Sequence, residues 1–314
     1  MRSPARVLLA SGLLLAAAAL TRAQQPPVFR SGVDVVNVTV AVHDERGRLV
    51  TDLAPQDFQL YQDGRPQDIR VFARAFEPGR DELLALDLGL LMDTSQSMVQ
   101  NLKLSRLAAT RFLDAVPRAH ELFMVFFDED IRISRYDSEN QQGLIERIQD
   151  VTGGRNTCLY DAIAVYLSRI QGSSGRKVLV LFTDGEDSRS DLSQVELNRL
   201  VRSSPVTIYS IAFSPDGVST SQRAAKSRQV LEHLADLTGG AVYAPATYKD
   251  LPSIYDKILD ELKGQYVLGF VPDRPTAEGR YHKLKVEVTR PGVKVRHRPG
   301  YTIDAGDITD GGES

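Results

Sequence analysis

The stretch LLALDLGLLMDTSQS, residues 83–97, decides the fold class of this chain. Residues 83–92 are almost continuously apolar, which is typical of a strand buried on both faces of a sheet. Asp93 ends this run, and the hydroxyl residues Ser95 and Ser97 follow two and four positions later. The stretch therefore predicts a central strand of a parallel sheet, with polar side chains gathered at its carboxyl end.

Short apolar runs alternate with segments of helical periodicity from about residue 83 to residue 264. Further strands are expected at Leu122–Phe127, Ile131–Tyr136, Lys177–Phe182, Val206–Phe213 and Ala241–Tyr243. The expected helices are Asn101–Val116, Glu139–Gln149, Leu159–Ile170, Gln229–Leu237 and Tyr248–Leu262. This alternation favours a doubly wound, Rossmann-like α/β domain whose helices cover both faces of a mostly parallel sheet. We expect the strand order 3-2-1-4-5-6.

One of these strands is expected to run against the others. Ile131–Tyr136 follows Leu122–Phe127 after only a few residues, whereas a parallel pair needs a crossover connection of about a dozen. We therefore expect one antiparallel edge strand in the otherwise parallel sheet.

Both flanks of the α/β domain show the period-two pattern of half-buried strands. Valines occupy every second position over Val36–Val42, and Asp63-Gly64 signals a hairpin. Apolar and charged residues alternate over Lys283–Val288. Neither flank alone has enough strands for a core, so we expect the two to pair into one antiparallel β-sandwich that carries the α/β domain as an insertion. Two separate small β units are the alternative.

The first 23 residues are predicted to be a secretory signal peptide. Two arginines precede the apolar run Val7–Leu20, and small residues lead to Ala23. The run is short for a membrane span, and an uncleaved N-terminal anchor is the alternative. We therefore expect an exported protein, periplasmic or extracellular, with no stable membrane span after cleavage.

The expected domain organisation follows from these patterns. The parts are a signal peptide at 1–23, an N-terminal β-rich region at 24–80, the α/β domain at 81–264, a C-terminal β-rich region at 265–303 that pairs with 28–75, and a flexible tail at 304–314.

Composition and missing motifs exclude several classes of function. The 314 residues carry 38 basic and 41 acidic side chains, a net charge of -3, so we expect no binding of nucleic acid through bulk charge. The single cysteine, Cys158, excludes an internal disulfide framework and a cysteine-built metal centre. Dinucleotide-binding, P-loop, nucleophile-elbow and zinc-protease motifs are missing from the sequence. We therefore expect a protein that is not an enzyme.

Polar residues from three loops are expected at one edge of the sheet. Asp93, Ser95 and Ser97 follow the first central strand, Thr157 precedes a helix, and Asp184 follows the strand Lys177–Phe182. Carboxylate and hydroxyl oxygens without nitrogen or sulfur suit Mg²⁺, Mn²⁺ or Ca²⁺. These ligands are too few to fill an octahedral shell, so water or a partner's carboxylate must complete it.

The three motifs resemble the metal-ion-dependent adhesion site of the von Willebrand factor type A domain family. They are Asp93-Thr94-Ser95-Gln96-Ser97, Thr157 before the next helix, and Thr183-Asp184-Gly185. The resemblance covers roughly residues 83–264, and the flanking β regions resemble those of bacterial exported VWFA-related proteins.

The resemblance implies a role for each site residue. Ser95 and Ser97 would bind the metal directly, Thr157 directly in a ligand-ready state, and Asp93 and Asp184 directly or through water. A partner protein would offer an Asp or Glu carboxylate to the open position. In relatives that switch, the last helix of the domain slides.

The function implied is an exported, metal-dependent protein-binding module for adhesion or complex assembly, with Mg²⁺, Mn²⁺ or Ca²⁺ bridging to a partner's carboxylate. A structural envelope module with a purely bracing metal is one alternative, and a metal-dependent hydrolase is another. The sequence predicts neither the identity of the partner nor an oligomeric state.

The candidate residues also have purely structural interpretations. Ser95 and Ser97 could cap the helix expected near Asn101, Thr157 could be the N-cap of the following helix, and Asp184-Gly185 could form an ordinary turn. The last hairpin is expected to present a solvated basic face made of Lys283, Lys285, Lys294, Arg296 and Arg298.

Overall fold

The computed structural model describes residues 35–75, 85–98, 102–116, 119–136, 153–170, 175–213, 222–272 and 279–302. The expected signal peptide, the expected helix Glu139–Gln149 and the expected tail at 304–314 lie outside these residues. All described residues belong to one compact unit that starts at Asp34. None of the helices described is both long and apolar enough to cross a membrane.

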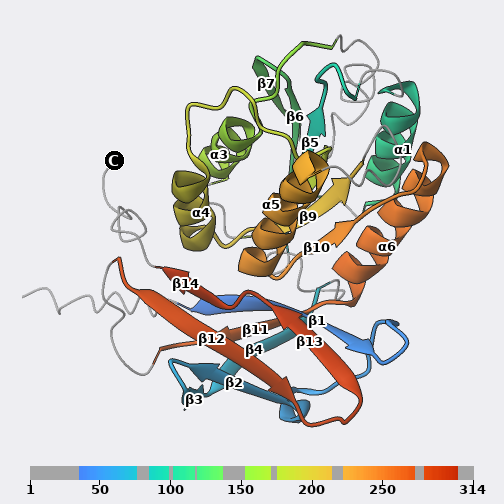
Figure 1. The fold of residues 1–314 in the computed structure, drawn as a ribbon. Helices are drawn as coiled ribbons and strands as arrows, with labels where there is room; N and C mark the ends of the chain where they lie inside the picture. Colours follow the sequence, from blue (N-terminus) through green and yellow to red (C-terminus); the bar gives the residue numbers. More distant parts are fainter. Residues whose placement is uncertain are drawn as a thin grey trace, which may run out of the picture. The chain divides into compact units, whose positions relative to one another are not determined.

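Six strands form the sheet of the α/β domain (Figure 1). They are β5 (Leu86–Asp93), β6 (Glu121–Phe127), β7 (Ile131–Tyr136), β8 (Arg176–Thr183), β9 (Thr207–Ala212) and β10 (Ala241–Tyr243). Their order is β10-β9-β8-β5-β6-β7, which is 3-2-1-4-5-6 when they are counted along the chain. Only β6 and β7 pair antiparallel. The doubly wound fold, its strand order and its antiparallel edge strand are confirmed.

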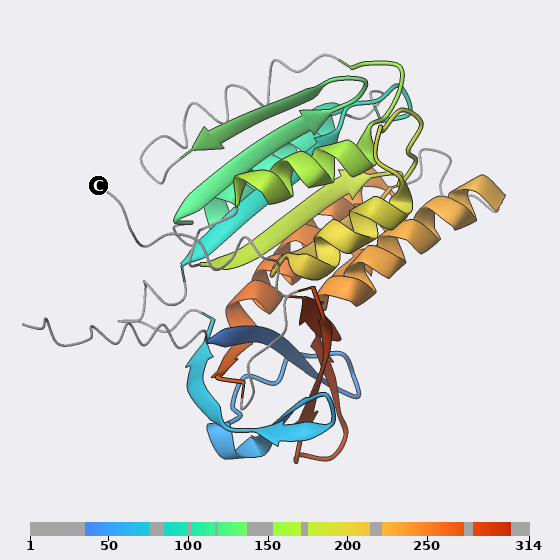
Figure 2. The ribbon, with the colours of Figure 1, turned by 90° about the vertical axis from the view of Figure 1, so that its left-hand side faces the viewer.

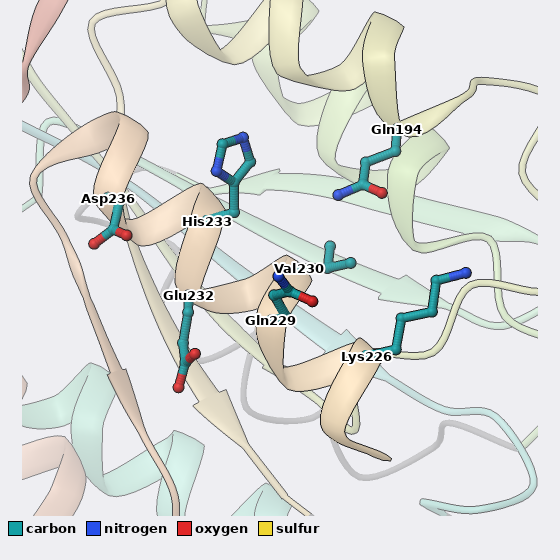
Figure 3. Close-up of a pocket in the computed structure, with 7 residues that line it drawn as sticks. All are labelled: Gln194, Lys226, Gln229, Val230, Glu232, His233 and Asp236. Atoms are coloured by element: carbon teal, nitrogen blue, oxygen red, sulfur yellow. The ribbon is translucent and has the colours of Figure 1, made fainter. Parts of the chain in front are cut away.

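Helices cover both faces of this sheet. Those described are α1 (Leu102–Ala115), α3 (Leu159–Arg169), α4 (Gln194–Ser203), α5 (Gln222–Thr238) and α6 (Leu251–Gly264), the last preceded by the 3-10 turn Tyr248–Asp250. α1 and α6 pack on one face, and α3, α4 and α5 pack on the other (Figures 1 and 2). α4 and α5 lie side by side (Figure 3).

The sequence patterns missed α4. Only Leu197 and Val201 of this helix are buried, so its apolar periodicity is weak. Its start was signalled by a capping box, in which Ser193 Oγ accepts from the N–H of Glu196 and the Glu196 carboxylate accepts from the N–H of Ser193, at 3.3 and 2.8 Å. The sequence shows this signal as Ser193-x-x-Glu196, a pattern that predicts the start of a helix.

β5 is buried along its whole length, as its apolar run predicted. Its alternate residues from Leu86 to Met92 pack toward α1 and α6, and Leu91 packs toward α3. Gly89 makes room for the ring of Tyr166, because a Cβ at this position would lie 2.3 Å from a ring carbon. This two-sided packing fixes the place of Asp93 at the end of the strand.

The two flanks form a β-sandwich of two antiparallel four-stranded sheets, ordered β13-β1-β11-β4 and β14-β12-β2-β3. The strands are β1 (Val36–Asp44), β2 (Phe58–Gln62), β3 (Arg65–Gln67), β4 (Ile69–Arg74), β11 (Tyr266–Phe270), β12 (Tyr281–Val288), β13 (Val293–His297) and β14 (Gly300–Thr302); the 3-10 turn Pro55–Asp57 precedes β2. N-terminal β1 pairs with C-terminal β11 and β13, and β2 pairs with β12. One sandwich built from both flanks is confirmed, and the alternative of two separate β units is wrong.

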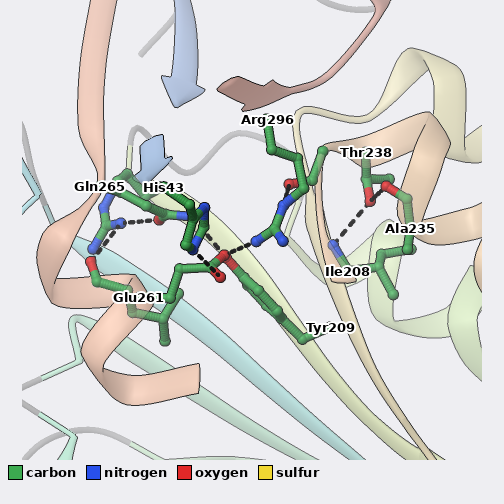
Figure 4. A network of polar contacts seen from close by, with 11 residues as sticks. His43, Ile208, Tyr209, Ala235, Thr238, Glu261, Gln265 and Arg296 are labelled. Carbon is green, nitrogen blue, oxygen red and sulfur yellow. Dashed lines mark hydrogen bonds and ion pairs between the residues drawn. The ribbon is translucent and has the colours of Figure 1, made fainter. Parts of the chain in front are cut away.

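A buried polar network joins the sandwich to the α/β domain (Figure 4). Glu261 of α6 is 3% exposed, and it accepts hydrogen bonds from Arg296 of β13 and, at 2.5 Å, from the hydroxyl of Tyr209 of β9. His43 of β1 lies 3.6 Å away from the same carboxylate. Burial raises the pKa of Glu261, but hydrogen bonding from His43 and the charge of Arg296 outweigh it and hold the pKa below its usual value.

This network corrects the expected solvated basic face of the last hairpin at Arg296 and Arg298, whereas Lys283, Lys285 and Lys294 are exposed as expected. Arg296 reaches the carbonyl oxygen of Gly239 at 3.1 Å as well as Glu261. Arg298 is buried, and its guanidinium donates to the carbonyl oxygen of Arg202 at the end of α4, at 3.0 Å. A period-two pattern shows which residues share a face, but it does not show that another domain covers that face.

Candidate metal site

Asp93 is held at the carboxyl end of β5 by two hydrogen bonds. Its Oδ1 accepts from the N–H of Ser95 at 2.9 Å, and its Oδ2 accepts from the hydroxyl of Thr183 at 2.6 Å. The side chain is completely buried. Thr183 is the last residue of the neighbouring strand β8, so this hydrogen bond joins the two strand ends at the carboxyl edge of the sheet.

Ser95, Ser97 and Asp184 continue this cluster. The two serine hydroxyls are 3.2 Å apart, and Ser97 Oγ donates to Oδ2 of Asp184 at 2.7 Å. Asp184 follows β8, and its Oδ1 accepts from the N–H of Glu186 at 3.0 Å. Four of the five sequence-predicted residues, Asp93, Ser95, Ser97 and Asp184, are thus linked by short polar contacts.

Thr157 is linked to this cluster through its backbone. Its N–H donates to Ser188 Oγ at 3.0 Å, and its carbonyl oxygen accepts from the N–H groups of Ser188 and Arg189 at 2.9 and 3.0 Å. It is therefore attached to the loop that carries Asp184. In the part of the chain that the structure describes, its hydroxyl makes no hydrogen bond to the other four residues, nor does it cap α3.

Side chains of the loop after Asp184, and not Thr157, accept hydrogen bonds from the first backbone N–H groups of α3. The N–H of Tyr160 donates to Asp187 Oδ1 at 3.2 Å and to Ser190 Oγ at 3.1 Å. Asp161 in turn accepts from the N–H groups of Asp191 and Leu192, at 2.8 and 3.0 Å. Asp187 and Asp161 therefore hold this loop against α3 through backbone contacts.

The sequence analysis missed a second buried carboxylate, Asp128, which forms hydrogen bonds beside the site. Asp128 follows β6, and its Oδ2 accepts from Thr94 Oγ1 at 2.8 Å and from Arg132 Nη2 at 2.6 Å. Hydrogen bonds from Arg132 and Thr94 outweigh burial and keep the pKa of Asp128 below its usual value. In the sequence Asp128 comes directly after an apolar run, as Asp93 does, and this position was the signal that could have found it.

The electrostatics of the cluster favour a cation. Burial and, to a smaller extent, the nearby charge of Asp184 raise the pKa of Asp93 to about 7, against the hydrogen bonds from Ser95 and Thr183 that lower it. Among the described residues, no arginine, lysine or histidine forms an ion pair with either carboxylate. A buried carboxylate is stable as an anion only beside positive charge.

The donor set fits a hard divalent cation. It offers two carboxylates and three hydroxyls, and such oxygen ligands are those preferred by Mg²⁺, Mn²⁺ and Ca²⁺. Among the residues described, no group of three or more His, Cys, Asp or Glu side chains is placed to hold a metal ion. A cation here would therefore depend on the serine and threonine hydroxyls as well as on the two acids.

The comparison with protein families identifies a known domain in this chain. The model of the von Willebrand factor type A domain matches residues 87–257, which is more than half of the chain. The chain belongs to the von Willebrand factor type A domain family. The family resemblance expected from the sequence is confirmed, and the candidate site lies in the matched segment.

Several solved structures are similar to parts of this von Willebrand factor type A protein at low sequence identity. A von Willebrand factor type A protein from Catenulispora acidiphila is 12% identical, with 88% of this chain and 76% of that chain covered and a TM-score of 0.48. The PilB minor pilin from Streptococcus sanguinis is 11% identical, with 60% and 63% covered and a TM-score of 0.49. An aerotolerance-related membrane protein from Bacteroides fragilis is 14% identical, with 57% and 98% covered and a TM-score of 0.46. No curated protein matches the chain.

Proposed function

We propose that this protein is an exported, metal-dependent protein-binding module that acts in adhesion or complex assembly. One observation carries the proposal: the buried carboxylate of Asp93 and the carboxylate of Asp184 are joined through Ser95 and Ser97 at the carboxyl edge of the sheet. In doubly wound sheets this edge is where ligands bind.

Asp93, Ser95, Ser97, Thr157 and Asp184 would hold the ion, Mg²⁺ by preference and otherwise Mn²⁺ or Ca²⁺. When bound, the cation neutralises the two carboxylates and offers a coordination position to an Asp or Glu of a partner protein. Thr183 orients Asp93 from beneath, and the hydrogen bonds of Thr157 to Ser188 and Arg189 keep its loop beside the Asp184 loop.

We propose no catalytic role for the site. In the described part of the chain, none of the hydrogen bonds of the five residues involves a histidine or a lysine that could serve as a general base. A bracing metal and a metal-dependent hydrolase remain the competing functions, and the experiments below separate them.

The first experiment measures metal binding alone. Chelator-treated protein is titrated with Mg²⁺, Mn²⁺ and Ca²⁺ by isothermal titration calorimetry, together with Asp184→Ala. The matched control is Asp191→Ala, because Asp191 lies exposed in the same loop and its side chain is no proposed ligand. Uptake that is lost in Asp184→Ala and kept in Asp191→Ala is expected. An absence of heat with all three ions would reject the site.

The second experiment measures partner binding. The purified protein is used to retrieve partners from the native envelope, in Mg²⁺ and in chelator, and the partners found are then tested as purified proteins. Binding that disappears in chelator while circular dichroism is unchanged supports the proposal. Partners retained in chelator would indicate a bracing metal, and turnover of phosphoesters or peptides in Mg²⁺ would indicate a hydrolase.

A further inference from the structure

A polar groove of about 470 Å³ lies between α4 and α5, on the face of the sheet opposite α1 and α6 (Figure 3). Val230 is its apolar, buried residue. Its polar side chains are Gln194 from α4 and Lys226, Gln229, Glu232, His233 and Asp236 from α5. Gln194 extends from its helix toward the α5 side of the groove (Figure 3). Side chains of these types can donate hydrogen bonds to a ligand and accept them from it.

Both walls of this groove lie next to the loop that follows Asp184. Gly185 has a positive φ of 81° and packs on α5, since a Cβ there would lie 2.9 Å from the carbonyl oxygen of Ser227. Ser227 is the neighbour of Lys226 in the groove. At its other end the loop leads to Ser193, the N-cap of α4, directly before Gln194. One end of the groove therefore adjoins the loop that follows Asp184.

The groove has opposite charges at its two ends. Lys226 lies near the loop that follows Asp184, next to Ser227. Asp236 lies ten residues further along α5, about 15 Å away at 1.5 Å per residue. Within the described residues neither side chain forms an ion pair, whereas Glu232 is bound to Arg228 at 2.8 Å. Lys226 and Asp236 are exposed and therefore accessible to charges on a ligand.

We propose that this groove binds an extended segment of the partner polypeptide whose carboxylate reaches the metal. An acidic residue of the segment faces Lys226, and a basic residue faces Asp236. A strand rises about 3.3 Å per residue, so the two are separated by four or five positions. Gln194 and Gln229 have amide groups that both donate to and accept from peptide groups. This inference rests on the proposed function, because the metal anchors one end of the segment.

The test uses a displayed library of twelve-residue peptides with one fixed Asp. Peptides are selected on the full chain in Mg²⁺ and eluted with chelator, then synthesised and titrated calorimetrically. We expect the selected peptides to share an acidic and a basic residue four or five positions apart. Hydrogen exchange of the complex should show added protection in α4 and α5.

Charge reversals make the test specific to the groove. Lys226→Glu and Asp236→Lys should each weaken the selected peptide about five- to tenfold, and the peptide with the matching charge reversed should recover the loss. The control is Lys249→Glu, because Lys249 is exposed beside α6 on the opposite face of the sheet. Metal binding without peptide should be unchanged in all three variants.

The outcomes separate this inference from the proposed function. Peptides that bind only with metal but ignore both charge reversals would overturn the groove and leave the metal site intact. Peptides that need Lys226 and Asp236 but survive chelator would overturn the continuity between groove and metal. A library that yields no chelator-sensitive peptide, from a protein that still takes up Mg²⁺ in calorimetry, would overturn the groove and leave the proposed function standing.

Discussion

Thr183, the last residue of β8, donates a 2.6 Å hydrogen bond from its hydroxyl to Oδ2 of Asp93, the last residue of β5. The same hydroxyl accepts from the N–H of Gly185 at 3.0 Å. Both side chains are fully buried. One hydroxyl therefore orients the first carboxylate of the candidate site and the loop that carries the second.

Thr183→Val should weaken metal binding about tenfold or more, because groups that orient metal ligands typically contribute 10- to 100-fold in affinity. The valine keeps the shape and removes both hydrogen bonds. Calorimetric titration with Mg²⁺ measures the change. Thr207→Val is the control, since Thr207 is a buried threonine at the opposite, amino end of β9. Equal affinities in the two variants would show that Thr183 does not position the site.

Asp93→Asn should have opposite effects with and without metal. The raised pKa of Asp93, about 7, means that the folded metal-free chain binds a proton that the unfolded chain has released above about pH 4. Stability without metal therefore falls as pH rises from about 4 to 7. In chelator at pH 8 the variant should be more stable by about 2 kcal/mol, because it buries no charge.

In Mg²⁺ the order should reverse, because binding to the folded state stabilises only the protein that takes up the ion. Urea denaturation in chelator and in Mg²⁺ measures both differences. Asp191→Asn, in which an exposed acid is replaced, should follow the native chain in both conditions. A native chain that is the more stable one in chelator would contradict the burial of an uncompensated charge.

Arg296→Met should destabilise the protein by about 3 kcal/mol. It leaves the carboxylate of Glu261, 3% exposed, without its arginine, and an unpaired buried charge is costly. The double variant Arg296→Met, Glu261→Met should recover most of the loss. Urea denaturation measures both. Arg70→Met removes an arginine from an exposed pair with Asp68 and should cost less than about 1 kcal/mol.

His297 should make the protein less stable in mild acid. Its Nδ1 donates to the carbonyl oxygen of Arg298 at 2.6 Å, and its Nε2 accepts from the N–H of Val286 at 3.1 Å, so both nitrogens are used by the neutral ring. Burial lowers its pKa below the usual 6.5.

As pH falls below about 6.5, the unfolded chain gains a proton that the folded chain does not, and stability declines. His297→Gln should flatten this part of a stability profile recorded between pH 7.5 and 5. His233→Gln is the control, because that ring is partly exposed on α5. A profile that keeps its slope in His297→Gln would exclude this histidine as the cause.

Hydrophobic periodicity predicted the fold because strands buried on both faces are continuously apolar, whereas strands buried on one face alternate between apolar and polar residues. The buried run before Asp93 became β5, and the short connection before Ile131 gave the antiparallel edge. Periodicity did not predict α4, because only two residues of this helix are buried. It also placed the start of α5 at Gln229, seven residues after its actual start. The helix expected from Tyr248 starts instead as a 3-10 turn, and α6 itself begins at Leu251.

The strand-end rule placed Asp93 and Asp184 in one cluster before any coordinates, and the structure brings them together through Ser95 and Ser97. Metal binding itself stays a prediction. Pairings between residues far apart in the chain had no local signal. Arg296 pairs with Glu261 of α6, and His282 lies 2.8 Å from Asp63. Both contacts join segments that are far apart in the sequence. Spacing along the sequence carries no information about such contacts.

The N–H of Ala75, after β4, donates to the carbonyl oxygen of Gln265, before β11, at 2.8 Å, and β4 and β11 are antiparallel neighbours. To the sandwich, the whole α/β domain is thus one oversized hairpin loop. Replacing it with a tight turn would leave every sandwich strand beside its present neighbours. The junction between Ala75 and Gln265 is therefore a position at which a different domain can be grafted onto the sandwich.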